Sequence, residues 1–362
     1  MKRFLTVLIM LIATAFSYAD EIDNRCKAFL VGDENGNIYY EQNIDEKLPL
    51  ASVTKMMTIL LAFDELKKGN VHLSDKVKVP KEVADIGGSR IWMKSDTDFT
   101  FEDLLKASAI YSANNATQGI AYYLSQGKVD TFVGKMNDKL KKLKIENMIE
   151  YYTPIGLPPH MTGKKMDVGN ARGLYKLSMA AAKNKKYMTI AGMKEAKIKV
   201  GEIKNRNKLL GIEGIYGIKT GHHDTAGYNI CIVSDENNVK LFVVVLGSKD
   251  EKTRDEVVLD KIKKFHEEYT YRVILDKEQP LSKVKVLAGA TKYVYIYPDK
   301  DLKKILKADS QINIRVKKEH FVTAPVKTGE VLGEYEVMID GKKVLKGKLL
   351  AKQGVSLYSP FK

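Results

Sequence analysis

A serine and a lysine three positions apart, Ser52 and Lys55 in the stretch LPLASVTKMM, could together carry out nucleophilic chemistry. In a helix, side chains three positions apart lie about 5 to 6 Å from each other on one face. A serine becomes a good nucleophile when a neighbouring base takes its proton, and a lysine can be that base when burial or a second cation lowers its pKa. The pair is therefore a candidate nucleophile and base, unless Ser52 only caps the helix and Lys55 faces solvent.

The same spacing occurs at residues 125–128 and 282–285, so the surroundings must distinguish the three copies. Gly127 weakens a helix at the second copy. The third copy lies within an alternating strand pattern, and side chains three positions apart in a strand point to opposite faces. Only Ser52 has the helical geometry, and the apolar residues that follow predict a buried helix in which Lys55 is poorly solvated.

Two further polar elements follow along the chain. In AIYSANNAT, Ser112 has a hydroxyl that can relay a proton, and Asn114 has an amide that can hold a substrate amide. In GIKTGHH, Lys219 and Thr220 enter a predicted strand, and Gly221 lets a ligand backbone approach closely. Taken alone, each element also fits an ordinary polar turn or strand end.

In chain order, these elements resemble the S-x-x-K, S-x-N and K-T-G motifs of the penicillin-binding protein and serine β-lactamase superfamily. The stretches GSRIWMKSDTDFTFEDLLKASAIYSANNA, NRNKLL and GIKTGHHDTAGYNI look specifically like those of the exported, low-molecular-weight D-alanyl-D-alanine carboxypeptidases. The resemblance covers essentially the whole mature chain. One difference is Ala113 at the centre of S-x-N, where carboxypeptidases often have glycine. A second KTG triplet, residues 327–329, is interpreted as a turn between strands.

The resemblance implies a reaction and a role for three residues. Ser52 would attack the carbonyl between the two terminal D-alanines of a peptidoglycan stem peptide, release D-alanine and form an acyl-enzyme that water hydrolyses. Lys55 would take the serine proton, and Ser112 would pass a proton to the leaving amine. Penicillins would acylate the same serine and act as inhibitors.

The resemblance also implies a set of substrate-binding residues: Asn114, Lys219, Thr220, Gly221, His222 and Arg254. Asn114 would hydrogen-bond both the substrate and Lys55. Lys219 would supply positive charge that lowers the Lys55 pKa and, with Thr220, would help to hold the terminal carboxylate of the substrate.

An oxyanion hole is implied at the backbone N–H groups of Ser52 and His222, and such a donor is worth on the order of 3 to 4 kcal/mol. Arg254 matches a family arginine near the carboxylate site. No metal is expected, because the six histidines have no metal-binding spacing and the adjacent pair His222 and His223 rarely lets both rings reach one ion. No other cofactor is expected.

Periodicity and turn signals predict the elements that must position these residues. Asn35 and Gly36 separate two apolar runs and predict a hairpin at residues 28–43. Helical patterns occur at residues 52–68, 101–110, 129–143, 170–183 and 254–271, and strand patterns at residues 227–235 and 240–248. Hairpins on either side of a helical middle predict an α+β fold, with an antiparallel sheet covered by helices as in DD-peptidases and β-lactamases.

Three segments are predicted along the chain. Residues 1–19 contain two basic residues, then an apolar run and a small-x-small site. This order is typical of a signal peptide, here cleaved after Ala19, and an uncleaved anchor helix is the alternative. Either would export the protein to the periplasm or cell envelope. Residues 20–274 are expected to form the serine DD-peptidase domain. Residues 275–362 are expected to form an all-β sandwich.

Composition bounds the possible partners. The chain has 60 Lys and Arg against 45 Asp and Glu, a net charge of +15, which suits nucleic acid, anionic lipid or acidic wall polymers. Export argues against nucleic acid. The C-terminal stretch LLAKQGVSLYSPFK has no amphipathic helix of the kind many relatives use to lie on a membrane, which leaves membrane association open. Cys26 and Cys231 could form a disulfide or remain two buried thiols.

Three other functions compete with the carboxypeptidase. A class A β-lactamase would use a glutamate in the loop after S-x-N, and residues 151–163 contain none. A non-catalytic wall-binding protein of the same fold would not require an intact Ser52, Lys55 and Lys219. A basic polyanion binder would explain the net charge but none of the motifs.

Overall fold

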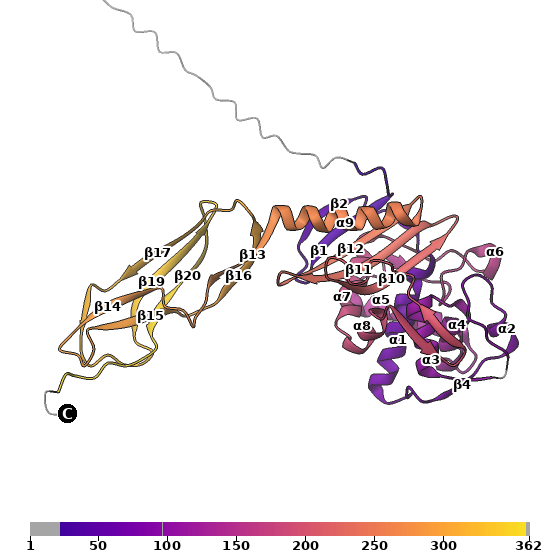
Figure 1. Ribbon diagram of the computed structural model, residues 1–362, viewed down its shortest axis with the longest axis horizontal. Coiled ribbons are helices and arrows are strands. Elements are labelled where there is room, and N and C mark those ends of the chain that lie inside the picture. The colour runs from indigo at the N-terminus through magenta and orange to yellow at the C-terminus, as the bar shows by residue number, and fades with distance from the viewer. Residues whose placement is uncertain (1–21, 96, 360–362) are drawn as a thin grey trace, which may run out of the picture.

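The structure is a computed structural model that describes residues 22–95 and 97–359. Figure 1 shows a mixed helical and β part followed by an elongated all-β part, with helix α9 (Glu251–Glu268) leading from one to the other. The predicted signal peptide, residues 1–19, lies outside the described residues. Among the helices of the described ranges, none combines the length and the hydropathy needed to cross a membrane.

A five-stranded antiparallel sheet lies at the centre of the first part. Its strand order is β10-β11-β12-β1-β2, with bounds β1 Ala28–Asp33, β2 Ile38–Gln42, β10 Ile215–His223, β11 Gly227–Glu236 and β12 Val239–Ser248. Successive side chains of a strand point to opposite faces. Val243 and Val245 of β12 pack with α9, whereas Val244 and Leu246 pack with helix α7 (Ala171–Ala182). Helices therefore cover both faces, which confirms the predicted fold class.

A layer of helices covers the face of the sheet opposite α9. It contains α1 (Lys55–Lys68), α2 (Lys81–Ala84), α3 (Phe101–Lys106), α4 (Asn114–Leu124), α5 (Val129–Leu143), α6 (Pro159–Thr162), α7 and α8 (Lys185–Ala191). Short strands pair among these helices: β3 (Leu48–Pro49) and β6 (Ile149–Glu150) with β7 (Val168–Gly169), β4 (Lys76–Lys78) with β5 (Asp98–Thr100), and β8 (Glu195–Ile198) with β9 (Gly201–Lys204). All side chains at residues 55–60 of α1 are buried, so this helix carries Lys55 into the core.

Two predicted helices differ from those in the structure. The helix expected at residues 101–110 is α3 followed by a π-helical turn, Ala107–Tyr111. The helix expected at residues 254–271 runs instead from Glu251 to Glu268, and the chain continues as strand β13 (Tyr269–Leu275). Aromatic and β-branched residues favour strands, and β13 finds a partner in β16 (Leu302–Lys307). The pairing partner therefore decides where the helix ends.

The all-β part contains the β13–β16 pair and a six-stranded sheet of order β17-β19-β20-β15-β14-β18. The remaining bounds are β14 Ser282–Leu287, β15 Tyr293–Pro298, β17 Ile312–Lys318, β18 Phe321–Thr323, β19 Val331–Ile339 and β20 Lys342–Ala351. Side chains of both sheets share one core, for example Leu275 of β13 and Val284 of β14. The boundary predicted between residues 274 and 275 falls within β13, so we propose that the module begins at Tyr269.

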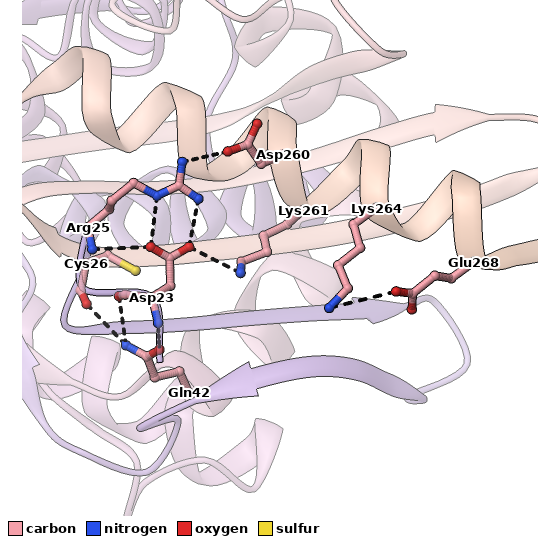
Figure 2. A network of polar contacts seen from close by, with 8 residues as sticks. All are labelled: Asp23, Arg25, Cys26, Gln42, Asp260, Lys261, Lys264 and Glu268. Atoms are coloured by element: carbon pink, nitrogen blue, oxygen red, sulfur yellow. Dashed lines mark hydrogen bonds and ion pairs between the residues drawn. The ribbon is translucent and has the colours of Figure 1, made fainter. Parts of the chain in front are cut away.

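The first described residues are held against α9 and β2 by polar contacts (Figure 2). Arg25 Nε donates to Asp23 Oδ1 at 2.9 Å, and Lys261 of α9 lies 3.2 Å from the other carboxylate oxygen. Arg25 also pairs with Asp260 of α9 at 2.6 Å. The Asp23 backbone N–H donates to the side-chain oxygen of Gln42 in β2 at 2.7 Å. These contacts fix the chain just before β1.

Both cysteines are free and buried. Cys26 precedes β1, and Cys231 lies in β11 opposite Lys219. Burial raises the pKa of each thiol to about 12. Of the two alternatives, the structure has two buried thiols and no disulfide between them.

Candidate active site

A cleft of about 560 Å³ lies between the helical layer and strand β10. Seven of the nine predicted site residues line it: Ser52, Ser112, Asn114, Thr220, Gly221, His222 and Arg254. The other two, Lys55 and Lys219, are buried behind the lining, with 0% and 2% of their surfaces exposed. Residues from four separate parts of the sequence therefore meet at one site.

The nucleophile candidate and its lysine are in direct contact. Ser52 lies in a 3₁₀ turn, Ala51–Thr54, that leads into α1, and the side chain of Ser52 does not cap either helix. Lys55 Nζ donates to Ser52 Oγ at 2.5 Å and to the Ile155 carbonyl at 2.8 Å. Burial, followed by the charge of Lys219, lowers the Lys55 pKa well below its usual value. The amine can therefore become neutral and accept the serine proton.

A strap formed by residues 152–157 holds the turn that carries Ser52. Its Ile155 carbonyl is a partner of Lys55, and its Pro154 carbonyl accepts from Thr58 Oγ1 of α1 at 2.6 Å. Gly156 packs so closely that a Cβ placed there would lie 1.9 Å from the Ala51 carbonyl oxygen. Only glycine permits this approach, so the strap packs directly against the turn Ala51–Thr54, here called the nucleophile turn.

Asp167 anchors the strap and was not identified from the sequence. Its Oδ1 accepts from the backbone N–H groups of Tyr152 at 2.6 Å and Thr153 at 2.9 Å. Its Oδ2 accepts from Thr153 Oγ1 at 2.6 Å and from Thr54 Oγ1 at 3.3 Å. Burial raises the Asp167 pKa against these hydrogen bonds, and the carboxylate charge in turn raises the pKa of Lys55. No local motif marks this residue, because its partners lie far from it in sequence.

Ser112 occupies an unusual backbone position. It follows the π-helical turn with φ 66° and ψ 30°, in the left-handed region that costs a serine free energy. Its hydroxyl oxygen is buried and has no hydrogen-bond partner within the described residues. Backbone strain and an unpaired buried hydroxyl are typical of functional sites, so Ser112 stays a candidate for the proton relay.

Asn114 begins helix α4 and lines the cleft. Its backbone N–H donates to the Ser89 carbonyl at 2.6 Å and its Nδ2 to the Gly87 carbonyl at 2.7 Å. The expected contact with Lys55 is absent: Lys55 donates to Ser52 and Ile155 and not to the amide oxygen of Asn114. Its Oδ1 has no hydrogen-bond partner in the part of the chain described. That oxygen can therefore accept from a substrate amide.

Positive charge is concentrated around strand β10. Lys219 Nζ donates to the Thr220 carbonyl at 2.9 Å. Burial, then Arg206 and Arg254, lower the Lys219 pKa to about 7. Arg206 also lines the cleft, and its guanidinium lies 4.3 Å from the ring centre of Tyr111. Such a cluster attracts an anionic group such as a carboxylate.

Gly221 lets β10 approach the nucleophile turn. A Cβ placed on this residue would lie 3.0 Å from the Ser52 backbone nitrogen and 2.9 Å from that of Val53. The next residue, His222, stacks its ring on Tyr228 of β11 with centres 3.9 Å apart. The backbone beside Gly221 is therefore close to the Ser52 N–H, as two donors to one oxyanion must be.

Arg254 lies in the first turn of α9 and is 2% exposed. Its Nε and one terminal nitrogen donate to Asp255 Oδ1 at 2.9 and 2.6 Å, and Glu251 lies 3.6 Å away. The guanidinium lines the cleft near Lys219, whose pKa it lowers. Within residues 22–95 and 97–359, no group of three His, Cys, Asp or Glu side chains could hold a metal ion.

Two protein families match the sequence. The family described as D-alanyl-D-alanine carboxypeptidase matches residues 14–250, and the family described as penicillin-binding protein 5, C-terminal domain, matches residues 269–356. The D-alanyl-D-alanine carboxypeptidase DacF of Bacillus subtilis is 29% identical over 98% of this chain and 94% of its own length. DacC of Escherichia coli is 29% identical over 96% of this chain and 89% of its own length.

Solved structures have the same fold. Penicillin-binding protein 5 from Haemophilus influenzae matches with a TM-score of 0.68 at 24% identity, covering 93% of this chain and 99% of that one. Penicillin-binding protein 6B from Escherichia coli matches with a TM-score of 0.70 at 21% identity, covering 91% and 96%. The two family matches cover the helical part and the all-β part in turn, and each structural likeness extends over both parts. The chain belongs to the D-alanyl-D-alanine carboxypeptidase family of penicillin-binding serine hydrolases.

Proposed function

We propose that Ser52 is the nucleophile with which this carboxypeptidase removes the terminal D-alanine from peptidoglycan stem peptides. The observation that carries the proposal is the buried amine of Lys55, 2.5 Å from Ser52 Oγ, with its pKa held low by burial and by Lys219. A neutral amine at that distance can take the hydroxyl proton as the serine attacks.

The cleft supports a specific orientation of the substrate. The terminal carboxylate lies toward Thr220 and the positive charges of Lys219 and Arg254. The scissile carbonyl oxygen then points between the backbone N–H groups of Ser52 and His222, where developing negative charge is stabilised. The penultimate residue's amide N–H faces the unpaired Oδ1 of Asn114.

The reaction then proceeds in two stages. Ser52 Oγ bonds to the carbonyl carbon while its proton moves to Lys55 Nζ. Collapse of the tetrahedral intermediate breaks the peptide bond, and the Ser112 hydroxyl relays a proton from Lys55 to the leaving nitrogen of D-alanine. Water next adds to the ester carbon, its proton goes to Lys55, and Ser52 leaves as the alcohol. Penicillins acylate the same oxygen by opening their four-membered ring.

A β-lactamase activity is disfavoured by the strap and its anchor. Residues 151–163 contain no glutamate. Both oxygens of the buried Asp167 already accept hydrogen bonds from Thr54 and from residues 152–153. A carboxylate occupied in this way is not free to activate water against an acyl-enzyme.

We also propose that residues 1–19 direct export to the periplasm or cell envelope, with cleavage after Ala19. Under this proposal the mature chain begins at Asp20, two residues before the first described residue. The proposed division is a catalytic domain up to Glu268 and a β module from Tyr269. Mass determination of the processed N-terminus tests the cleavage site.

Incubation of purified residues 20–362 with a stem peptide ending in D-Ala-D-Ala, and separately with a fluorescent penicillin, tests the proposed nucleophile. Free D-alanine and covalent labelling are expected, and Ser52→Ala should abolish both. Ser282→Ala is the matched control, because Ser282 begins another S-x-x-K stretch in strand β14 and should be dispensable. Labelling that survives Ser52→Ala would exclude Ser52, and labelling without D-alanine would exclude carboxypeptidase turnover.

A further inference from the structure

The outer face of strands β14, β15 and β18 exposes large apolar side chains in an orderly array. We name it the tyrosine face and define it as Lys283, Lys285, Leu287, Tyr293, Tyr295 and Phe321. Phe321 is 58% exposed and Tyr295 54% exposed, whereas alternate residues of the same strands, such as Val284 and Ile296, are buried. The core of the module is thus complete without the exposed rings.

Strand pairing places these side chains on one surface. Lys283 is paired with Tyr295, and Lys285 with Tyr293, in the antiparallel ladder of β14 and β15. On the other side of β14, Lys285 is paired with Phe321 of β18. Directly paired residues point to the same face of a sheet. Rings and ammonium groups therefore alternate across three strands.

The face is strongly basic. Lys283 Nζ lies 4.5 Å, and Lys292 Nζ 5.8 Å, from the ring centre of Tyr293. None of the six residues of the face is acidic, and residues 269–362 contain 19 Lys and Arg against 10 Asp and Glu. The complementary partner must therefore carry negative charge.

Charge alone does not explain the rings. An acidic polymer in solution would engage the lysines but would gain little from Phe321 and Leu287, which offer no polar atom. At the surface of a lipid bilayer, aromatic rings settle at the level of the headgroups, and lysine stems lie along apolar surface while their ammonium groups reach phosphates. Apolar and cationic side chains on one sheet face fit such a surface.

We propose that the tyrosine face docks the β module on an anionic lipid bilayer. Strands β14 and β15 lie in the part of the molecule remote from helices α4 and α6, which contribute residues to the cleft (Figure 1). A molecule bound through this face keeps its cleft open to the surrounding wall. Adsorption through the tyrosine face does not depend on the proposed catalytic role of Ser52.

Co-sedimentation of residues 20–362 with vesicles tests the proposal; the apolar segment 1–19 is omitted because it would bind lipid by itself. Binding is expected to vesicles of phosphatidylcholine and phosphatidylglycerol at three to one, and not to phosphatidylcholine alone. Lys283→Gln with Lys285→Gln should weaken binding about 25-fold, roughly 5-fold for each lysine. Tyr293→Ser, Tyr295→Ser and Phe321→Ser together should weaken it by at least about 10-fold.

Matched controls lie on the first part of the chain. Trp92→Ser removes an aromatic ring that is 69% exposed, and Lys185→Gln with Lys186→Gln removes two exposed lysines. Both controls should bind like the parent. Penicillin labelling and thermal unfolding verify that each variant is folded, and Phe321→Ser alone replaces the triple variant if that one unfolds.

Three results would overturn the proposal. The first is failure of the parent to bind anionic vesicles. The second is equal loss of binding in the control variants. The third is loss in the lysine variant with none in the aromatic variants, since a purely ionic contact would indicate an acidic polymer rather than a bilayer.

Discussion

Replacing Gly221 by alanine should slow acylation of Ser52 by about 10²- to 10³-fold. The added Cβ would lie 3.0 Å from the Ser52 nitrogen and 2.9 Å from the Val53 nitrogen, closer than the 3.4 Å at which ordinary contact begins. Either β10 or the nucleophile turn must move by several tenths of an ångström, and the new methyl group would stand beside the Ser52 N–H. Loss of one oxyanion donor costs about 2.7 to 4 kcal/mol, which gives the stated factor.

The control for this prediction is Gly329→Ala in the second KTG triplet. Gly329 has φ +83° with no atom within 4 Å of an added Cβ, so alanine there strains the backbone without touching the cleft. The assay is the rate of fluorescent penicillin labelling, with thermal unfolding of each variant measured in parallel. Labelling of Gly221→Ala at the parental rate, or equal slowing in Gly329→Ala, would refute the assignment of the oxyanion hole.

Three further predictions concern the charges and strain around the cleft. Lys219→Ala should slow D-alanine release roughly 10- to 150-fold through loss of a charged hydrogen bond, whereas Lys327→Ala should not; equal effects would contradict the assignment. Asp167→Asn removes a charge that raises the Lys55 pKa, so that pKa falls and the acidic limb of the acylation profile should move to lower pH. A shift to higher pH would contradict this sign. Ser112→Gly should raise the free energy of unfolding by about 1 kcal/mol and slow D-alanine release about 100-fold or more, measured by denaturant unfolding and product assay. Unchanged turnover would exclude the relay.

Local signals in the sequence are sufficient to predict the helix that follows Ser52 and the first hairpin. The apolar residues after Ser52 predict a helix that ends at residue 68, and α1 ends at Lys68, with Gly69 as its left-handed cap. The first hairpin was predicted from Asn35 and Gly36, and β1 and β2 flank that pair. Both signals act over a few residues, so these elements form without a distant partner in the sequence.

The bounds of elements that depend on distant partners cannot be predicted from local signals. The aromatic and β-branched residues from Tyr269 onward fit a helix or a strand, and the choice is made by β16, some 30 residues later. The π-helical turn and the left-handed backbone of Ser112 also depend on distant partners. A strained conformation persists only where the surrounding structure enforces it. The backbone around Ser112 is held partly by the Ser89 and Gly87 carbonyls, which bind Asn114.

The sequence reveals the pair Ser52 and Lys55 but not Asp167, which supports it, because only the pair is local in the sequence. Ser52 and Lys55 are recognisable because one helical turn brings them together, so their spacing carries the chemistry. Asp167 acts over more than 100 residues of sequence on Thr54, and through residues 152–153 it fixes the strap whose Ile155 carbonyl contacts Lys55. A motif thus specifies which groups react, whereas the pKa that lets Lys55 act as a base is set by burial and by charges that only the folded chain assembles. The depressed Lys55 pKa is therefore a property of the fold, and substitutions at Asp167 or Lys219 should change it in opposite directions.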